Sequence, residues 1–294
     1  MPGISDLVVT ADDGLELAVR DHGGEGPDVV FVHGVTRTLE DWSPVLGRLP
    51  GVRAVTMDLR FHGRSGVPED ASWKDFVHDI DGVVDGLDLS DPFIVGHSFG
   101  GMVAVAYAVR HPACPGVVNI DGFDFRQREL LDELEPSVID EFLENFRAST
   151  SVVPAGSGDD TWLAEQKESL RQLDEMWHVP DEVAAATLER VFVRTADGWE
   201  RRPPNPNRFF AFLDGQVDLL TMLRQITAPA VYVACRPPGD AGIFATARAG
   251  LERHVAAIAA ERPNVRLETI VATHGVIFEQ SGEIAAMIHA LVAA

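Results

Sequence analysis

The segment Gly96-His97-Ser98-Phe99-Gly100 places a serine between two glycines at a point where the hydrophobic pattern of the chain changes. The apolar run 92–95 before it predicts a buried strand, and residues 102–108 after it predict a helix. A serine at such a strand-to-helix turn is held with its hydroxyl exposed for nucleophilic attack. Side chains in place of Gly96 or Gly100 would collide with the neighbouring strand and helix. The spacing therefore predicts that Ser98 is a nucleophile.

A nucleophilic serine needs a histidine to accept its proton and an acid to orient that histidine. His274 follows the last predicted strand, residues 265–271, in a loop from which a side chain reaches back over the sheet edge. The chain order serine, acid, histidine suits this architecture. We therefore expect His274 to be the base. The histidines do not show the spacing from carboxylates that is typical of metal ligands, so no metal site is expected.

Two aspartates are the main candidates for the acid. Asp121 ends the predicted strand 117–120, and a carboxylate that leaves a buried strand directly is held rigidly and needs a partner. Asp240 follows the predicted strand 230–234, the commoner location in such sheets, but it lies in a proline-rich loop of unusual length. We favour Asp121 and keep Asp240 as the alternative acid, with Asp124 as a third and weaker option.

Attack on a carbonyl creates an oxyanion, which is stabilised by backbone N–H donors aimed at it. Phe99, directly after the predicted nucleophile, would supply one donor from the start of its helix. The loop His33-Gly34-Val35-Thr36 follows the apolar strand 29–32 and would supply the other donor, from Val35. The sequence thus predicts an oxyanion hole formed by Val35 and Phe99, with His33 and Gly34 in the oxyanion loop.

These candidate residues are separated by elements that alternate between strand and helix patterns. The expected strands are residues 7–10, 15–19, 29–32, 52–57, 92–95, 117–120, 230–234 and 265–271, and the expected helices between and after them are 71–87, 100–110, 243–261 and 281–293. Such alternation predicts an α/β fold with a mainly parallel central sheet flanked by helices. The site is then expected beyond the carboxyl ends of the strands.

Residues 126–226 have a different character. Acidic amphipathic stretches at 127–147, 161–177, 181–191 and 207–225 predict helices, without strands between them. We expect a helical cap over 126–226, inserted into a core formed by 1–125 and 227–294. Pockets concentrate at such junctions. The cap aromatics that are candidates for the pocket wall are Phe142, Phe146, Trp162, Trp177, Phe192, Phe209, Phe210 and Phe212.

Composition restricts the possible partners. The net charge of −22 disfavours nucleic acids and anionic membranes. No apolar stretch approaches the roughly 20 residues of a membrane span, and residues 1–6 do not have the pattern of a signal peptide. The two cysteines, Cys114 and Cys235, are too few for a disulfide framework. We expect a cytoplasmic protein that acts on a small molecule without a metal or organic cofactor; no feature indicates an oligomeric state.

Together these motifs resemble the α/β-hydrolase fold family, in particular its capped bacterial serine hydrolases. The resemblance rests on His33-Gly34, the run 58–65 (DLRFHGRS), the glycine-flanked serine and His274. Two departures are present. Phe61 stands where family members commonly have glycine, which puts a bulky ring near the loop and is expected to alter the lining of the pocket but not the triad. The family's Gly-x-x-Asp after the late strand is replaced by Cys235-Arg236-Pro237-Pro238, so Asp240 comes two residues late.

The resemblance implies hydrolysis of an ester, lactone or thioester of a small to medium apolar molecule through an acyl-enzyme. One alternative is acyl transfer or natural-product tailoring on the same triad. Another is ligand binding with little turnover, because a fold does not determine a function. Epoxide hydrolases and haloalkane dehalogenases of this family use an aspartate as the nucleophile, and Ser98 at that position disfavours both activities.

Overall fold

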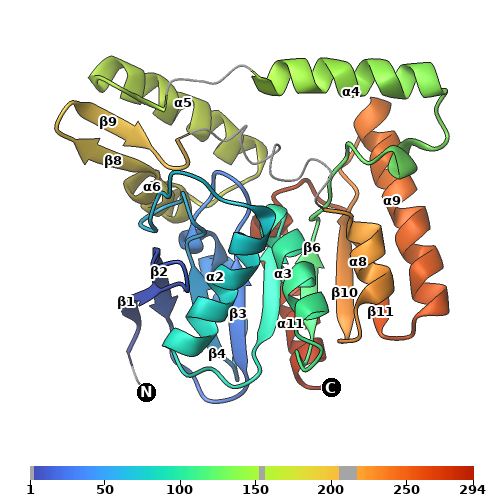
Figure 1. Cartoon of the computed structure of the whole chain (residues 1–294), viewed down its shortest axis with the longest axis horizontal. Coiled ribbons are helices and arrows are strands. Elements are labelled where there is room, and N and C mark those ends of the chain that lie inside the picture. Colours follow the sequence, from blue (N-terminus) through green and yellow to red (C-terminus); the bar gives the residue numbers. More distant parts are fainter. Residues whose placement is uncertain (1–2, 152–155, 205–216) are drawn as a thin grey trace.

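The computed structural model describes residues 3–151, 156–204 and 217–294 (Figure 1). Its centre is an eight-stranded sheet with the order β1-β2-β4-β3-β5-β6-β10-β11. The strands are β1 (Ser5–Thr10), β2 (Glu16–Asp21), β3 (Asp28–Val32), β4 (Arg53–Met57), β5 (Phe93–His97), β6 (Val117–Ile120), β10 (Ala230–Cys235) and β11 (Val265–Ile270). Only the pairs β1–β2 and β2–β4 are antiparallel in this sheet. The predicted mainly parallel sheet is therefore confirmed.

The carboxyl ends of the four central strands lie level with one another. Val32 of β3 pairs with Gly96 of β5, which pairs with Asn119 of β6, and Asn119 pairs with Tyr232 of β10. The residues that directly follow these positions therefore emerge along a single edge of the sheet. In parallel sheets this edge is where ligands bind.

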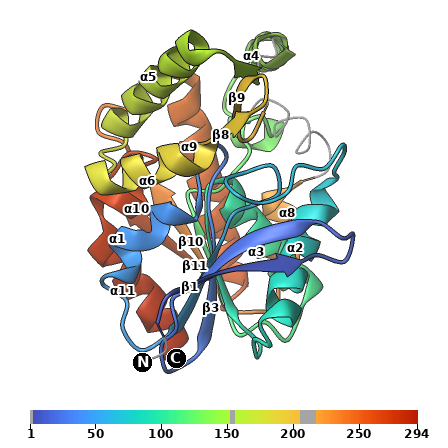
Figure 2. The same cartoon turned by 90° about the vertical axis from the view of Figure 1, so that its left-hand side faces the viewer.

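Helices cover both faces of the sheet (Figure 2). On one face lie α2 (Trp73–Gly86), α3 (Phe99–Arg110), α8 (Leu219–Gln225) and α9 (Gly242–Glu261); on the other lie η1 (Leu39–Trp42), α1 (Ser43–Leu46), α10 (Val276–Glu279) and α11 (Ser281–Val292). Alternate residues of β3 pack into the two helical layers. Val30 and Val32 pack on the α3 side, whereas Val29 and Phe31 pack on the α11 side. This explains why the strand reads as a continuous apolar run.

Among the described residues, several further elements lie between β6 and β10 along the chain. These are η2 (Arg128–Leu131), α4 (Pro136–Ser151), β7 (Ser157–Gly158), α5 (Asp160–Met176), α6 (Asp181–Val191), β8 (Phe192–Thr195), β9 (Gly198–Arg201) and α8. In Figure 1, α4, α5 and the β8–β9 hairpin lie together at the top, beyond one end of the large sheet. We call residues 126–204 the inserted segment.

The inserted segment differs from the expected all-helical cap in two ways. It contains a three-stranded antiparallel sheet, β7-β9-β8, whose short, half-buried strands have too few residues for a clear alternating pattern. In addition, α8 falls within the expected cap boundaries but packs on α3 and α9 of the core. The first part of the expected helix 207–225 lies outside the described residues.

Two buried ion pairs join the inserted segment to the core. Arg37 Nη1 lies 2.5 Å from Asp174 Oδ1 of α5, and Arg190 Nη2 of α6 lies 2.6 Å from Asp58 Oδ2. Removing one partner of such a pair would leave a buried charge uncompensated, at a cost of about 3–5 kcal/mol. The α5–α6 half of the inserted segment is therefore firmly attached to the core.

Within the described part of the chain, the structure contains no helix that is both long enough and apolar enough to cross a membrane.

Candidate functional site

Ser98 occupies a strained turn between β5 and α3. Its backbone has φ 55° and ψ −123°, a conformation that residues other than glycine rarely adopt. The turn is tight because a Cβ at Gly96 would lie 2.1 Å from the carbonyl oxygen of Gly100, and a Cβ at Gly100 would lie 2.3 Å from that of Val32. The two glycines are thus required by close backbone approach, as expected from their spacing.

His274 and Asp121 are in direct contact although 153 positions separate them in the chain. The ring nitrogen Nδ1 of His274 lies 2.6 Å from Asp121 Oδ2, and a carboxylate can only accept here, so Nδ1 carries the proton. Asp121 Oδ1 accepts a second hydrogen bond from the backbone N–H of Cys235 at 3.2 Å. The carboxylate is 2% exposed and satisfied on both oxygens. This arrangement leaves His274 Nε2 as the nitrogen able to accept a proton.

The two other candidate acids have different partners. Asp240 Oδ2 accepts a hydrogen bond from Arg248 Nε at 2.8 Å. Asp124 receives a bidentate contact from Arg126, two residues further on. Among the described contacts of His274, Asp121 is therefore the carboxylate in reach of its ring.

Two residues, His97 and Trp177, contact the loop that carries His274 from two sides. Neither contact was predicted from the sequence. His97 Nε2 donates a hydrogen bond to the backbone carbonyl of His274 at 2.8 Å. Trp177, at the end of α5, packs edge-on against the His274 ring with centroids 5.2 Å apart. A Cβ at Gly275 would lie 2.3 Å from the Trp177 carbonyl oxygen. In the sequence, only its position next to Ser98 could have indicated that His97 lies at the site.

The loop after β3 is fixed by two buried histidines. His33 Nδ1 donates to the carbonyl oxygen of Gly34 at 2.7 Å, while its Nε2 accepts from the N–H of Leu59 at 3.1 Å. His62 Nε2 accepts from the N–H of Thr36 at 3.2 Å. Burial lowers the pKa of both histidines to about 3, so both rings are neutral and keep these donor and acceptor roles.

The contact between His33 and Gly34 bears directly on the predicted oxyanion donor. The carbonyl of Gly34 and the N–H of Val35 belong to the same planar peptide unit and point in opposite directions. A hydrogen bond that fixes the carbonyl therefore also fixes the direction of the N–H. On the other side, Phe99 is the first residue of α3, where backbone N–H groups point out of the helix.

Ser98, His274, Asp121, Val35 and Phe99 all line one cavity of about 290 Å³. Its remaining described lining residues are Met102, Phe123, Phe125, Phe244 and Arg248. The structure thus brings the favoured triad candidates and both candidate oxyanion donors to a single concave space. The cavity is small compared with drug-binding pockets, which suits a small molecule.

The aromatic wall of this cavity differs from the expected one. None of the described cap aromatics is among its lining residues. Phe142 and Phe146 instead pack around Phe125, and Trp162 packs against Phe192 in a separate small core. Phe209, Phe210 and Phe212 lie outside the described residues. The described aromatic wall comes from the start of α3, the segment after β6 and α9.

Phe61 adopts a backbone conformation that is unusual for a residue with a side chain. It has φ 69°, in the left-handed region that favours glycine. Its ring is buried and lies 6.5 Å from that of Phe76 in the core. Phe61 is not among the described residues that line the cavity. Among the described residues, its effect is on backbone strain and on packing against Phe76.

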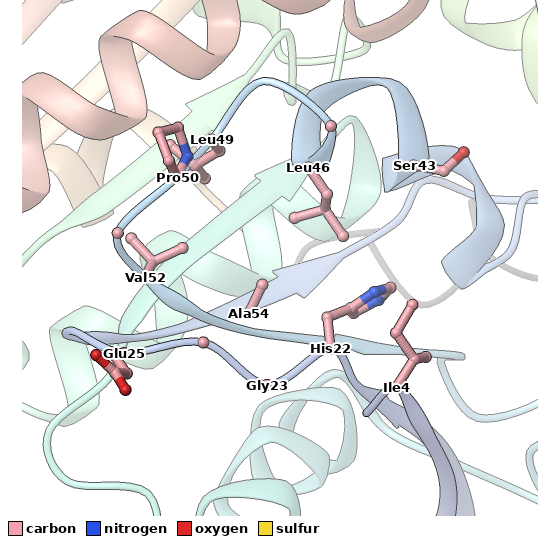
Figure 3. A pocket seen from close by; sticks show the side chains of 13 residues that line it. Ile4, His22, Gly23, Glu25, Ser43, Leu46, Leu49, Pro50, Val52 and Ala54 are labelled. Atoms are coloured by element: carbon pink, nitrogen blue, oxygen red, sulfur yellow. The ribbon is translucent and has the colours of Figure 1, made fainter. Parts of the chain in front are cut away.

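A second, larger cavity of about 780 Å³ lies at the opposite end of the sheet, near the amino ends of β3 and β4 (Figure 3). Its wall is formed by Ile4, residues 22–25, Ser43, residues 46–47, residues 49–52 and Ala54. The histidine in this wall, His22, has its Nε2 3.1 Å from Thr56 Oγ1. Ser43 and Glu25 also line this cavity, but no hydrogen bond among the described residues joins either of them to His22, so we assign the candidate site to the smaller cavity.

The order of the strands and the serine turn at the carboxyl edge define the α/β-hydrolase architecture. In agreement, the family described as "Alpha/beta hydrolase family" matches residues 29–287. The chain therefore belongs to the alpha/beta hydrolase family.

Similar proteins include an epoxide hydrolase of Caballeronia sordidicola, 36% identical over 107 residues, which are 35% of this chain and 32% of that protein. A 2-(acetamidomethylene)succinate hydrolase of Mesorhizobium japonicum is 34% identical over 127 residues, 42% of this chain and 45% of that protein. The alignments thus span less than half of these relatives. The solved structure of E-2-(acetamidomethylene)succinate hydrolase superposes with a TM-score of 0.71 over 99% of this chain and 100% of the other, at 22% identity, and shares the fold.

Proposed function

We propose that the protein is a serine hydrolase that cleaves an ester-type bond, in an ester, lactone or thioester, of a small to medium substrate. The observation that carries this proposal is the 2.6 Å contact between His274 Nδ1 and Asp121 Oδ2 beside Ser98 in the same cavity. A buried carboxylate that fixes the histidine tautomer gives the remaining ring nitrogen the role of a general base. Binding alone does not require this arrangement.

In the proposed mechanism, Ser98 Oγ attacks the substrate carbonyl while His274 Nε2 takes its proton. The positive charge formed on the ring is stabilised by Asp121, which stays ionised. The backbone N–H groups of Val35 and Phe99 donate to the developing oxyanion. His274 then returns the proton to the leaving group, and a water activated by the same nitrogen hydrolyses the acyl-enzyme. Asp121, not Asp240, is the acid in this proposal.

The similarity to epoxide hydrolases does not lead us to propose that activity. The family resemblance implies that an aspartate is the nucleophile in such enzymes, and this chain has Ser98 at the corresponding turn. A serine would have to be alkylated by the epoxide, and its ether could not be hydrolysed as an aspartyl ester can. Acyl chemistry is therefore the reaction that the residues at this turn favour.

The proposal is tested by the hydrolysis of p-nitrophenyl esters from acetate to dodecanoate. Ser98→Ala and His274→Ala are expected to lower kcat by several orders of magnitude, and Asp121→Asn by about 10⁴-fold, because it loses the correct tautomer. Asp124→Asn is the matched control, since it makes the same change in a carboxylate that contacts Arg126 and has no role in the proposed mechanism. A folded wild type no faster than Ser98→Ala on esters, lactones and thioesters alike would overturn the proposed function.

A further inference from the structure

The cavity beside Ser98 contains a cation within a largely aromatic wall. Arg248 and Phe244 both line it, and they lie four positions apart on α9, so one face of this helix is directed at the site. Phe125 packs edge-on against Phe244 with centroids 5.2 Å apart. The ionisable residues among the described lining are Asp121, His274 and Arg248. Since Asp121 is engaged with His274, Arg248 is the cation available to a ligand.

The guanidinium of Arg248 is positioned but only partly used. Asp240 accepts a hydrogen bond from its Nε at 2.8 Å, which fixes the plane of the group. Within the described part of the chain, the two terminal nitrogens of Arg248 have no hydrogen-bond partner. A guanidinium offers five N–H donors in a planar fork, and four of them belong to these terminal nitrogens. Two parallel donors are the geometry that a carboxylate binds.

We propose that Arg248 binds a carboxylate carried by the substrate, so that the protein prefers anionic esters such as monoesters of dicarboxylic acids. This inference rests on the proposed function, because it names the substrate class of the same site. The arrangement also gives Asp240 a role, since the residue considered as an alternative acid serves to position the arginine. Asp240 is thus a positioning residue, not a catalytic one.

The net charge of the chain makes such a local cation necessary for anion binding. At −22 the protein as a whole repels anions. This repulsion is screened within about 8 Å at physiological ionic strength, whereas a direct contact with Arg248 inside the cavity is screened much less. The side chain of Arg248 is 24% exposed, so it keeps part of its hydration and the contact gains less than a fully buried one.

The first experiment compares kcat/KM for mono-p-nitrophenyl glutarate with kcat/KM for p-nitrophenyl butyrate, a neutral ester of similar acyl length. A charge-assisted hydrogen bond contributes enough to expect the anionic-to-neutral ratio to fall by about 10- to 100-fold in Arg248→Gln. Arg236→Gln is the matched control, because it removes the same charge from an exposed arginine that pairs with Glu252 of α9 and does not line the cavity. In this control the ratio is expected to stay at the wild-type value.

A second arm places the carboxylate on the leaving group, in 4-(butanoyloxy)benzoate. A drop in its kcat/KM ratio to phenyl butyrate in Arg248→Gln, with the glutarate ratio unchanged, would assign the carboxylate to the alcohol side of the substrate. An equal ratio in wild type, Arg248→Gln and Arg236→Gln for both anionic esters would overturn the anion site while leaving the proposed hydrolase function intact.

A third arm does not depend on turnover. Glutarate and its neutral analogue glutaramide are titrated into the wild-type protein by calorimetry. Glutarate is expected to bind at least tenfold more tightly, and Arg248→Gln is expected to lose this difference. If no ester is hydrolysed but glutarate binds through Arg248, the proposed function fails and the anion site stands. Equal binding of the two compounds by wild type would overturn the anion site.

Discussion

His97 donates a hydrogen bond from Nε2 to the backbone carbonyl oxygen of His274 at 2.8 Å, so the residue before Ser98 holds the residue proposed as its base. The two rings also lie against each other, with centroids 4.7 Å apart. Burial lowers the pKa of His97 well below its usual value, so the ring is neutral and Nε2 keeps its proton as a donor. The serine turn and the histidine loop are thereby connected through a single side chain.

We expect His97→Ala to lower kcat by about 10- to 100-fold with little change in KM, because His274 loses a fixed position relative to Ser98. His97→Gln retains an N–H donor of similar reach and should recover part of the loss. The pH optimum of kcat should stay the same in both variants, since His97 does not exchange protons in the reaction. A shifted optimum would indicate instead that His97 titrates during catalysis.

A second prediction concerns the peptide between Gly34 and Val35. His33→Ala should lower kcat by about 10²-fold, because the N–H of Val35 would no longer be held toward the oxyanion. His33→Asn places an amide N–H close to the position of Nδ1 and should restore much of kcat. It still leaves the buried N–H of Leu59 without its acceptor, which costs about 1–3 kcal/mol of unfolding free energy. Steady-state kinetics and urea unfolding separate the two effects; equal kcat in Ala and Asn variants would count against the proposed orientation.

A third prediction follows from the strain at Ser98. Its φ of 55° costs about 1–3 kcal/mol in a residue with a Cβ, and glycine relieves that cost. Glycine also loses about 0.5–1 kcal/mol through the greater freedom of the unfolded chain. Ser98→Gly should therefore unfold at a higher temperature than Ser98→Ala, although both lack the nucleophile. Calorimetry of the two inactive proteins measures the difference, and a lower Tm for Ser98→Gly would show that the turn is not strained.

A fourth prediction concerns the pH dependence of stability. His33, His62 and His97 have lowered pKa values in the folded protein, so they bind protons on unfolding once the pH falls below about 6.5. Their contribution is present above that pH and is lost as the pH falls, by about 1.4 kcal/mol per pH unit for each histidine. Burial raises the pKa of Asp79 to about 6, and its opposite contribution offsets one of the three.

The measurement for this prediction is urea unfolding at pH 7.5, 6 and 5. The unfolding free energy should decrease toward pH 5, because the three buried histidines outweigh the opposite contribution of Asp79. His62→Gln should reduce this decrease and is the variant control. A free energy independent of pH over this range would contradict the neutral, buried state of the three rings.

Much of the fold follows from local sequence patterns. The apolar runs that predicted strands match β3, β5, β6 and β10 to within one or two residues, because a strand buried on both faces needs a continuous apolar run. The helix expected at 181–191 is α6, with the same limits. The tight turn at Ser98 could be predicted from its flanking glycines, because only residues without a Cβ fit against the backbone of Gly100 and Val32. The short strands β8 and β9 lack such a pattern and were not predicted.

The contacts that define the candidate site were decided by the tertiary structure. Asp121 and Asp240 both follow central strands, and the sequence alone left both open as partners of His274. Their assignment depends on where the loops after β6 and β10 pass, which brings Asp121 to His274 and Asp240 to Arg248.

The order of the elements and the contacts of the site therefore differ in how far the sequence could predict them. Sequence periodicity determined the order of the elements and the position of the serine turn, because those depend on neighbouring residues. The contact of Asp121 with His274, the support of His274 by His97 and the contact of Asp240 with Arg248 join residues between 8 and 177 positions apart. Such pairs meet only when the complete sheet and its covering segments are packed, because no local pattern records the direction in which a loop leaves its strand.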